Sequence, residues 1–135
     1  MPMTTEEARR FLQSVFDRLF DPAASAEDVG AFFSPDYVQD VDGRRLDRGE
    51  FLNHVRVLKS TLDSATVTFK EIAVDGTTIA DIHVVEARKK NGDRVRVKVM
   101  AFYTLENGKI RRIEELTYLL EGRAEDRDLG FRVLH

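Results

Sequence analysis

The sequence predicts an α+β fold in which three N-terminal helices pack against one curved antiparallel sheet. Apolar residues recur with a helical period in the first half of the chain and alternate with polar residues in the second half. In the second half, the dipeptides Asp75-Gly76, Asn91-Gly92 and Asn107-Gly108 are typical of hairpin turns. Consecutive hairpins make an antiparallel meander, so the 135 residues are expected to form one domain, residues 1–135.

The three expected helices begin at N-terminal capping signals. Their ranges are 4–20, 25–34 and 48–62. Thr4 is followed three residues later by Glu7, and Asp47 by Glu50, which is the spacing of a capping box. Prolines follow the first two helices and end them. In the third helix, His54 lies at the edge of the apolar stripe that begins at Phe51.

Five strands are expected around and after these helices. Their ranges are 37–41, 67–76, 77–90, 93–106 and 109–122. The strand at 93–106 has the clearest apolar face, which we expect to be the concave one. Its members are Val95, Val97, Val99, Ala101, Tyr103 and Leu105.

The Asn91-Gly92 turn decides which residues of the preceding strand share that face. A two-residue turn would pair Val99 with Val84 and would put Asp81 and His83 on the opposite face, beside Met100 and Phe102. That opposite face mixes apolar and charged side chains, which predicts a homodimer surface.

The facing of the last strand stays open from the residues alone. A two-residue turn at Asn107-Gly108 would put Glu114 on the concave face, whereas a three-residue turn with a glycine bulge would put Glu115 there.

Composition excludes several classes of function. The net charge is −3 with dispersed basic residues, which argues against a nucleic-acid partner. The chain has no cysteine, and His54, His83 and His135 lack the spacing of a metal site, so no metal and no cofactor is expected. The sequence has no apolar run of membrane-spanning length and no signal peptide at its start, so we expect a cytoplasmic protein without a membrane partner.

The order of elements resembles the nuclear transport factor 2-like superfamily over about residues 5–122. The segments AFFSPDYVQDVDG and NGKIRRIEELTYLLEG carry the resemblance. It implies a cone-shaped sheet that the helices close around an apolar cavity. It favours the inward position for Glu115. The superfamily includes isomerases, cyclases, dehydratases and transport factors, so the fold alone does not give the function.

The segment VQDVDG is similar to the ketosteroid isomerase segment that carries the general base, which would be Asp40 here. A carboxylate in an apolar cone has a raised pKa and can accept a proton from carbon. The isomerase's oxyanion donors are missing, because Val15, Phe16 and Ala101 occupy their places. Steroid isomerisation is therefore not expected.

These observations predict an acid–base isomerase, cyclase or dehydratase acting on a small apolar molecule. Asp40 would be the base, and His54 and Glu115 would assist it. The expected cavity-lining residues are Phe16, Val97, Val99, Ala101, Tyr103 and Glu114. The alternative is a non-catalytic ligand-binding or regulatory dimeric module.

Overall fold

The computed structural model describes residues 3–128. These residues form three α-helices and a short C-terminal 3-10 helix, namely α1 (Thr5–Leu19), α2 (Ala26–Gly30), α3 (Arg48–Thr61) and η1 (Ala124–Asp128). Each α-helix begins with a complete capping box, with Thr4, Ser25 and Asp47 as N-caps. The second helix is shorter than expected, because the chain is already extended at Phe33. His135, one of the three histidines considered for a metal site, lies outside the described residues.

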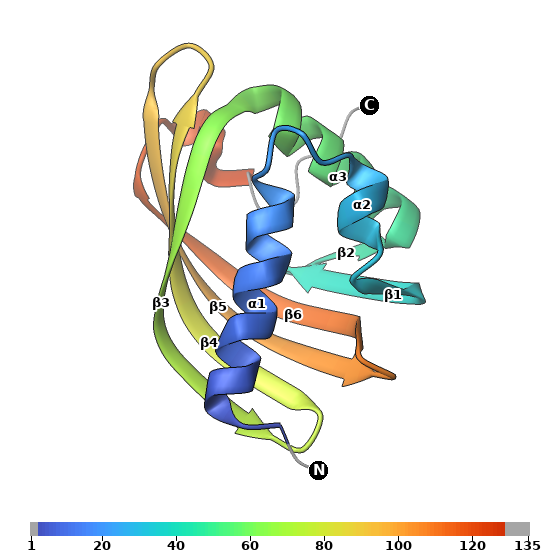
Figure 1. Ribbon diagram of the computed structural model, residues 1–135. Coiled ribbons are helices and arrows are strands. Elements are labelled where there is room, and N and C mark those ends of the chain that lie inside the picture. The colour runs from blue at the N-terminus through green and yellow to red at the C-terminus, as the bar shows by residue number, and fades with distance from the viewer. Residues whose placement is uncertain (1–2, 129–135) are drawn as a thin grey trace.

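The described strands form one six-stranded sheet with the order β2-β1-β6-β5-β4-β3. Their bounds are β1 (Phe33–Val41), β2 (Arg44–Asp47), β3 (Leu62–Asp75), β4 (Thr78–Lys89), β5 (Arg94–Glu106) and β6 (Lys109–Glu121). All neighbouring strands are antiparallel except β1 and β6, which pair in parallel. The sheet is strongly curved (Figure 1). The α+β fold with helices against a curved sheet is confirmed, whereas the four-residue strand β2 and the parallel pair were not expected.

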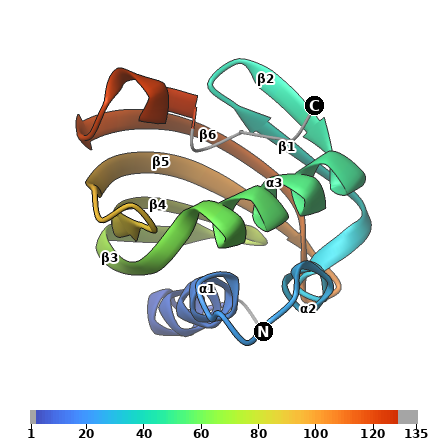
Figure 2. The ribbon, with the colours of Figure 1, turned by 90° about the horizontal axis from the view of Figure 1, so that it is seen from above.

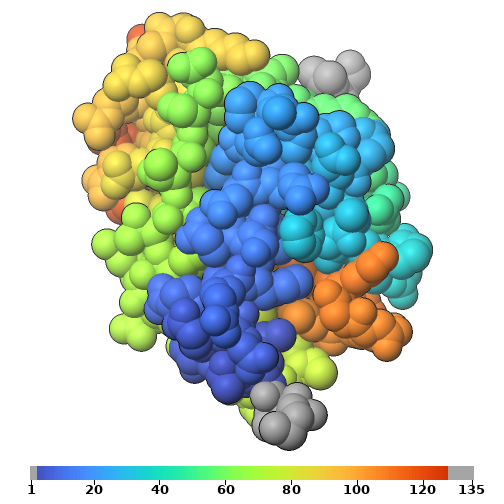
Figure 3. Space-filling model, viewed as in Figure 1, coloured from blue at the N-terminus to red at the C-terminus, as the bar shows by residue number. Residues whose placement is uncertain are grey.

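The helices lie on the concave side of the sheet. Figure 2 shows α1, α2 and α3 on this side, and no described element covers the other face. In Figure 3, α1 lies across the helical face beside β3. The core between the layers contains fully buried side chains from both, such as Leu12, Tyr37, Ile79 and Ile110. Among the described residues, no helix is long and apolar enough to cross a membrane.

The β4–β5 turn is one residue longer than expected, and this corrects the predicted register. The Gly92 N–H donates to the Lys89 carbonyl at 2.9 Å, and the Lys89 N–H donates to the Asp93 carbonyl at 2.8 Å. Gly92 has a φ of 93°, as in a three-residue turn that ends in a glycine bulge. The cross-strand partner of Val99 is therefore His83, whereas Val84 was expected.

This shift places every residue of β4 on the opposite face from the one expected. Asp81 pairs with Ala101 and, like His83, is buried on the concave face. The prediction that Asp81 and His83 lie on the outer face was wrong, because one added turn residue exchanges the two faces of a strand.

The β5–β6 connection combines a two-residue turn with a bulge in the strand that follows. Asn107 and Gly108 have φ values of 53° and 75°, as expected of a type I′ turn. Leu105 then pairs with Ile110, but Thr104 pairs with Arg112, so β6 contains one extra residue. This bulge, rather than a longer turn, reverses the alternation of β6.

The reversed alternation decides which of the two adjacent glutamates faces the helices. Glu115 pairs with Ala101 on the concave face, whereas Glu114 pairs with Phe102 and is exposed on the outer face. The predicted cavity position of Glu114 was therefore wrong.

Candidate functional site

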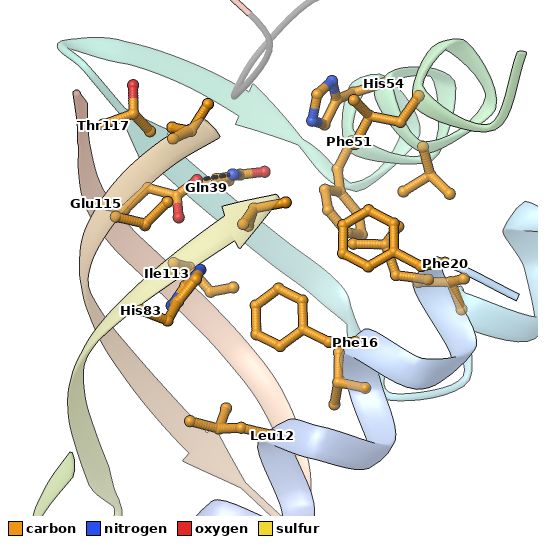
Figure 4. Close-up of a pocket in the computed structure, with 18 of the residues that line it drawn as sticks. Leu12, Phe16, Phe20, Gln39, Phe51, His54, His83, Ile113, Glu115 and Thr117 are labelled. Atoms are coloured by element: carbon orange, nitrogen blue, oxygen red, sulfur yellow. Dashed lines mark hydrogen bonds between the residues drawn. The ribbon is translucent and has the colours of Figure 1, made fainter. Parts of the chain in front are cut away.

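An apolar cavity of about 140 Å³ lies between the concave face of the sheet, α1 and α3. Figure 4 shows Phe16 of α1, Phe20 at the C-cap of α1 and Phe51 of α3 on one side and the sheet residues on the other. An engineered apolar cavity of about 150 Å³ binds benzene, so this cavity has room for a group of that size. Most of its lining is apolar. The polar side chains that reach it are Gln39, His54, His83, Tyr103, Glu115 and Thr117.

Glu115 of β6 is the acidic side chain that lines this cavity. The parallel pairing of β1 with β6 brings Gln39 next to it, and the Gln39 Nε2 donates to Glu115 Oε1 at 2.5 Å (Figure 4). Burial raises the pKa of Glu115 from 4.5 to about 7, against the opposing effects of the Gln39 hydrogen bond and of His83. Both protonation states are therefore populated near neutral pH, which suits a group that accepts and returns a proton.

His83 and Asp81 of β4 form a buried pair beside Glu115. The Nδ1 of His83 lies 2.8 Å from Oδ2 of Asp81, and both side chains are almost completely buried. A carboxylate that accepts a hydrogen bond from Nδ1 places a proton on that nitrogen and fixes the orientation of the imidazole. The ring of Phe16 lies 4.8 Å from the His83 ring and holds it from the helical side.

Four buried polar atoms near this group have no hydrogen-bond partner among the described residues. They are the hydroxyls of Tyr37 and Tyr103, Oε1 of Gln39 and Oδ1 of Asp81. Burial, followed by nearby carboxylates, raises the pKa of both phenols well above 10, so both stay protonated. Unpaired buried polar groups are costly to stability and tend to occur at functional sites.

Asp40, the predicted base, does not reach the cavity. Tyr37, Gln39 and Val41 are buried, so strand alternation turns Asp40 to the outer face. There it forms ion pairs with Arg45 Nε at 3.2 Å and Arg112 Nη2 at 2.5 Å. The predicted cavity position of Asp40 was wrong, because the similarity of the VQDVDG segment does not determine which face of β1 Asp40 occupies.

The other predicted residues lie on the cavity side. Phe16, Val97, Val99, Tyr103 and His54 line the cavity, with His54 on the α3 wall opposite Glu115 (Figure 4). Ala101 faces the same way but is buried in the core outside the lining. Their roles stay predictions.

Sequence reasoning missed Gln39, Asp81, His83 and Thr117 as site residues. The Asp-x-His spacing on a strand indicates that Asp81 and His83 share a face, but the turn length decides which face. Within residues 3–128, no three His, Asp or Glu side chains are grouped so as to hold a metal ion.

Comparison with known proteins supplies the family. The sequence profile of the SnoaL-like domain matches residues 8–113. The chain belongs to the SnoaL-like domain family. A relative of this chain is the protein C11D3.04c of Schizosaccharomyces pombe. The two sequences are 35% identical over 126 residues, which cover 93% of this chain and 97% of that protein.

Solved structures with the same fold include AusH from Aspergillus nidulans, with a TM-score of 0.74, 14% identity and coverage of 98% of this chain and 94% of that chain. An LEH-like epoxide hydrolase from M. tuberculosis has a TM-score of 0.68, 18% identity and coverage of 94% and 90%. An NTF2-like protein from Exiguobacterium has a TM-score of 0.66, 16% identity and coverage of 82% and 97%. The fold expected from the resemblance to the nuclear transport factor 2-like superfamily is therefore confirmed.

Proposed function

We propose that this SnoaL-like protein binds a small, mainly apolar carbonyl compound in the cavity and moves a proton on it by general acid–base catalysis. The observation that carries this proposal is Glu115, a carboxyl group with a pKa of about 7 in an apolar cavity. Glu115 replaces Asp40 in the role expected from the sequence. The reaction class is isomerisation, cyclisation or dehydration, as for the expected function.

The chemistry needs a base, an acid and exclusion of water. The ionised Glu115 takes a proton from a carbon next to the carbonyl group, and the protonated Glu115 returns it to another carbon. The isomerisation therefore consumes no net proton and regenerates the carboxylate. The amide of Gln39 can donate to the ionised carboxylate or, after rotation, accept from the protonated one. His83, oriented by Asp81, is the second group that can exchange a proton with the substrate.

The fold likeness to an epoxide hydrolase supports a small-molecule enzyme only at the level of the fold. The apolar side chains of α1 and α3 keep bulk water from the carboxyl group, which strengthens electrostatic interactions within the cavity.

The test is proton exchange on cyclohexanone and cyclohexenone in D2O, followed by NMR. We expect the wild-type protein to accelerate deuterium incorporation next to the carbonyl and Glu115→Gln to lose at least about 100-fold of that acceleration, since a general base contributes roughly 10²–10⁴-fold. Asp40→Asn is the matched control, because it removes a carboxylate from the outer face of the adjacent strand. An unchanged rate in Glu115→Gln would show that Glu115 is not the base.

The outer face of the sheet favours a second function, in which two copies of this chain associate as a homodimer. Large apolar side chains are exposed along β5 and β6. They are Met100 (52% exposed), Phe102 (60%), Leu116 (66%), Tyr118 (69%) and Leu120 (42%). A groove of about 800 Å³ runs over this face, and acidic and basic side chains, Asp40 and Glu114 with Arg45 and Arg112, lie along it. Charges of both signs on one patch allow a two-fold related copy to match it, so we propose a homodimer through this face.

Phe102→Glu is expected to convert the dimer to a monomer, because it would bury an unpaired charge in the proposed interface. Light scattering coupled to size-exclusion chromatography at micromolar concentrations measures the mass. Ser14→Glu adds the same charge to an exposed position of α1 and is expected to leave the dimer intact. A monomeric wild-type protein would contradict the proposal.

A further inference from the structure

We propose that Asp42, in the turn between β1 and β2, is a positioning residue that fixes Glu115 in the cavity wall beside Gln39. The geometric part stands by itself, and its consequence for catalysis rests on the proposed function. Asp42 does not line the cavity, and it lies two residues from Asp40, the base predicted from the sequence.

Asp42 holds β6 on both sides of Leu116. Its N–H donates to the carbonyl of Glu115 at 3.1 Å. Its Oδ1 accepts from the N–H of Thr117 at 2.7 Å, and its Oδ2 accepts from the Thr117 hydroxyl. These bonds extend the parallel pairing of β1 and β6 one residue past its last pair, Val41 and Glu115.

The turn conformation favours this residue type. Asp42 has a φ of 50°, in the left-handed region that aspartate, asparagine and glycine adopt at little cost. A carboxylate in this conformation reaches β6 with both oxygens. Glycine has no side chain to do so, and asparagine has only one acceptor oxygen.

The start of β6 is irregular against both neighbours. A bulge lies between Ile110, which pairs with Leu105, and Arg112, which pairs with Thr104, and the pairing of β1 with β6 shifts between Phe33 and Val38. Beyond the bulge, regular pairing with β5 sets the facing of Glu115, whereas on the other side the pairing with β1 ends at Glu115. The bonds of Asp42 to Glu115 and Thr117 keep this part of β6 aligned so that Gln39 reaches Glu115.

Asp42 is also one of the charged groups that face Glu115. Asp42 and Asp81 raise the pKa of Glu115 by like charge, and His83 lowers it, while burial remains the largest cause. The phenols of Tyr37 and Tyr103, which face the same region from β1 and β5, stay protonated. Removing the charge of Asp42 should therefore lower the pKa of Glu115.

Asp42→Asn tests the charge, with Asp40→Asn as its matched control on the same segment. The readout is the titration of the Glu115 side-chain carboxyl carbon by NMR, without any substrate. We expect the pKa of Glu115 to fall in Asp42→Asn and to stay at the wild-type value in Asp40→Asn. The same titration in all three proteins would overturn the electrostatic part.

Thr117→Val tests the positioning separately, because it removes the hydroxyl contact and leaves the charge of Asp42. We expect faster water exchange of the Gln39 side-chain amide in Thr117→Val and no change in Asp40→Asn. Unchanged exchange in Thr117→Val would overturn the positioning role. Because neither readout depends on turnover, a failure of Glu115 as the catalytic base would be seen separately, in the exchange assay on ketones.

Discussion

The wild-type protein is expected to lose roughly 3 kcal/mol of stability through Glu115 as the pH rises from 4.5 to above 7, and Glu115→Gln is expected not to show this loss. The pKa of Glu115 is 4.5 in the unfolded chain and about 7 in the folded protein. Within this window the folded state binds more protons than the unfolded state, so the free energy of unfolding falls with rising pH. The contribution is fully present below 4.5 and lost above about 7.

Urea unfolding of both proteins at a series of pH values between 4 and 8 measures this difference. Glutamine keeps the size of the side chain and cannot ionise, so the gap between the two stability curves should change across the window. Glu114→Gln is the matched control, since Glu114 is the adjacent residue and exposed on the outer face. Its curve should run parallel to that of the wild type. A constant gap between Glu115→Gln and the wild type would mean that Glu115 titrates normally in the folded state.

Filling the cavity by Val97→Phe is expected to abolish ligand-induced stabilisation. The Val97 side chain lines the cavity, so a phenyl ring there occupies much of its volume of about 140 Å³. A ligand at 100 times its Kd stabilises the wild-type protein by about 2.7 kcal/mol, and this gain should disappear. The measurement is a thermal shift with cyclohexanone.

Thr66→Phe is the control for the added ring, because Thr66 is exposed on β3 and does not line the cavity. It should retain the shift of the wild type. If Val97→Phe responds to cyclohexanone as strongly as the wild type, the ligand binds elsewhere, and the groove on the outer face is the next place to examine.

The site could be predicted only in part from the sequence. The apolar wall that Phe16, Val97 and Val99 provide follows from periodicity, which each element carries within its own residues. The pKa of Glu115 could not be predicted, because it depends mainly on burial between two layers of the fold. The motif VQDVDG predicted Asp40 in the cavity. In the structure, Tyr37, Gln39 and Val41 are the buried residues of β1, so Asp40 points to the outer face.

The sequence by itself determined the elements of this protein, since capping boxes, hairpin dipeptides and hydrophobic periods are local signals. It also determined the family, through the match over residues 8–113. Only the tertiary structure decided which side chains meet in the cavity. A three-residue turn at Gly92 brought in Asp81 and His83, and a bulge before Arg112 brought in Glu115 and turned Glu114 outward. The physical reason is that side chains alternate along a strand with a period of two, so one residue more or less exchanges its two faces.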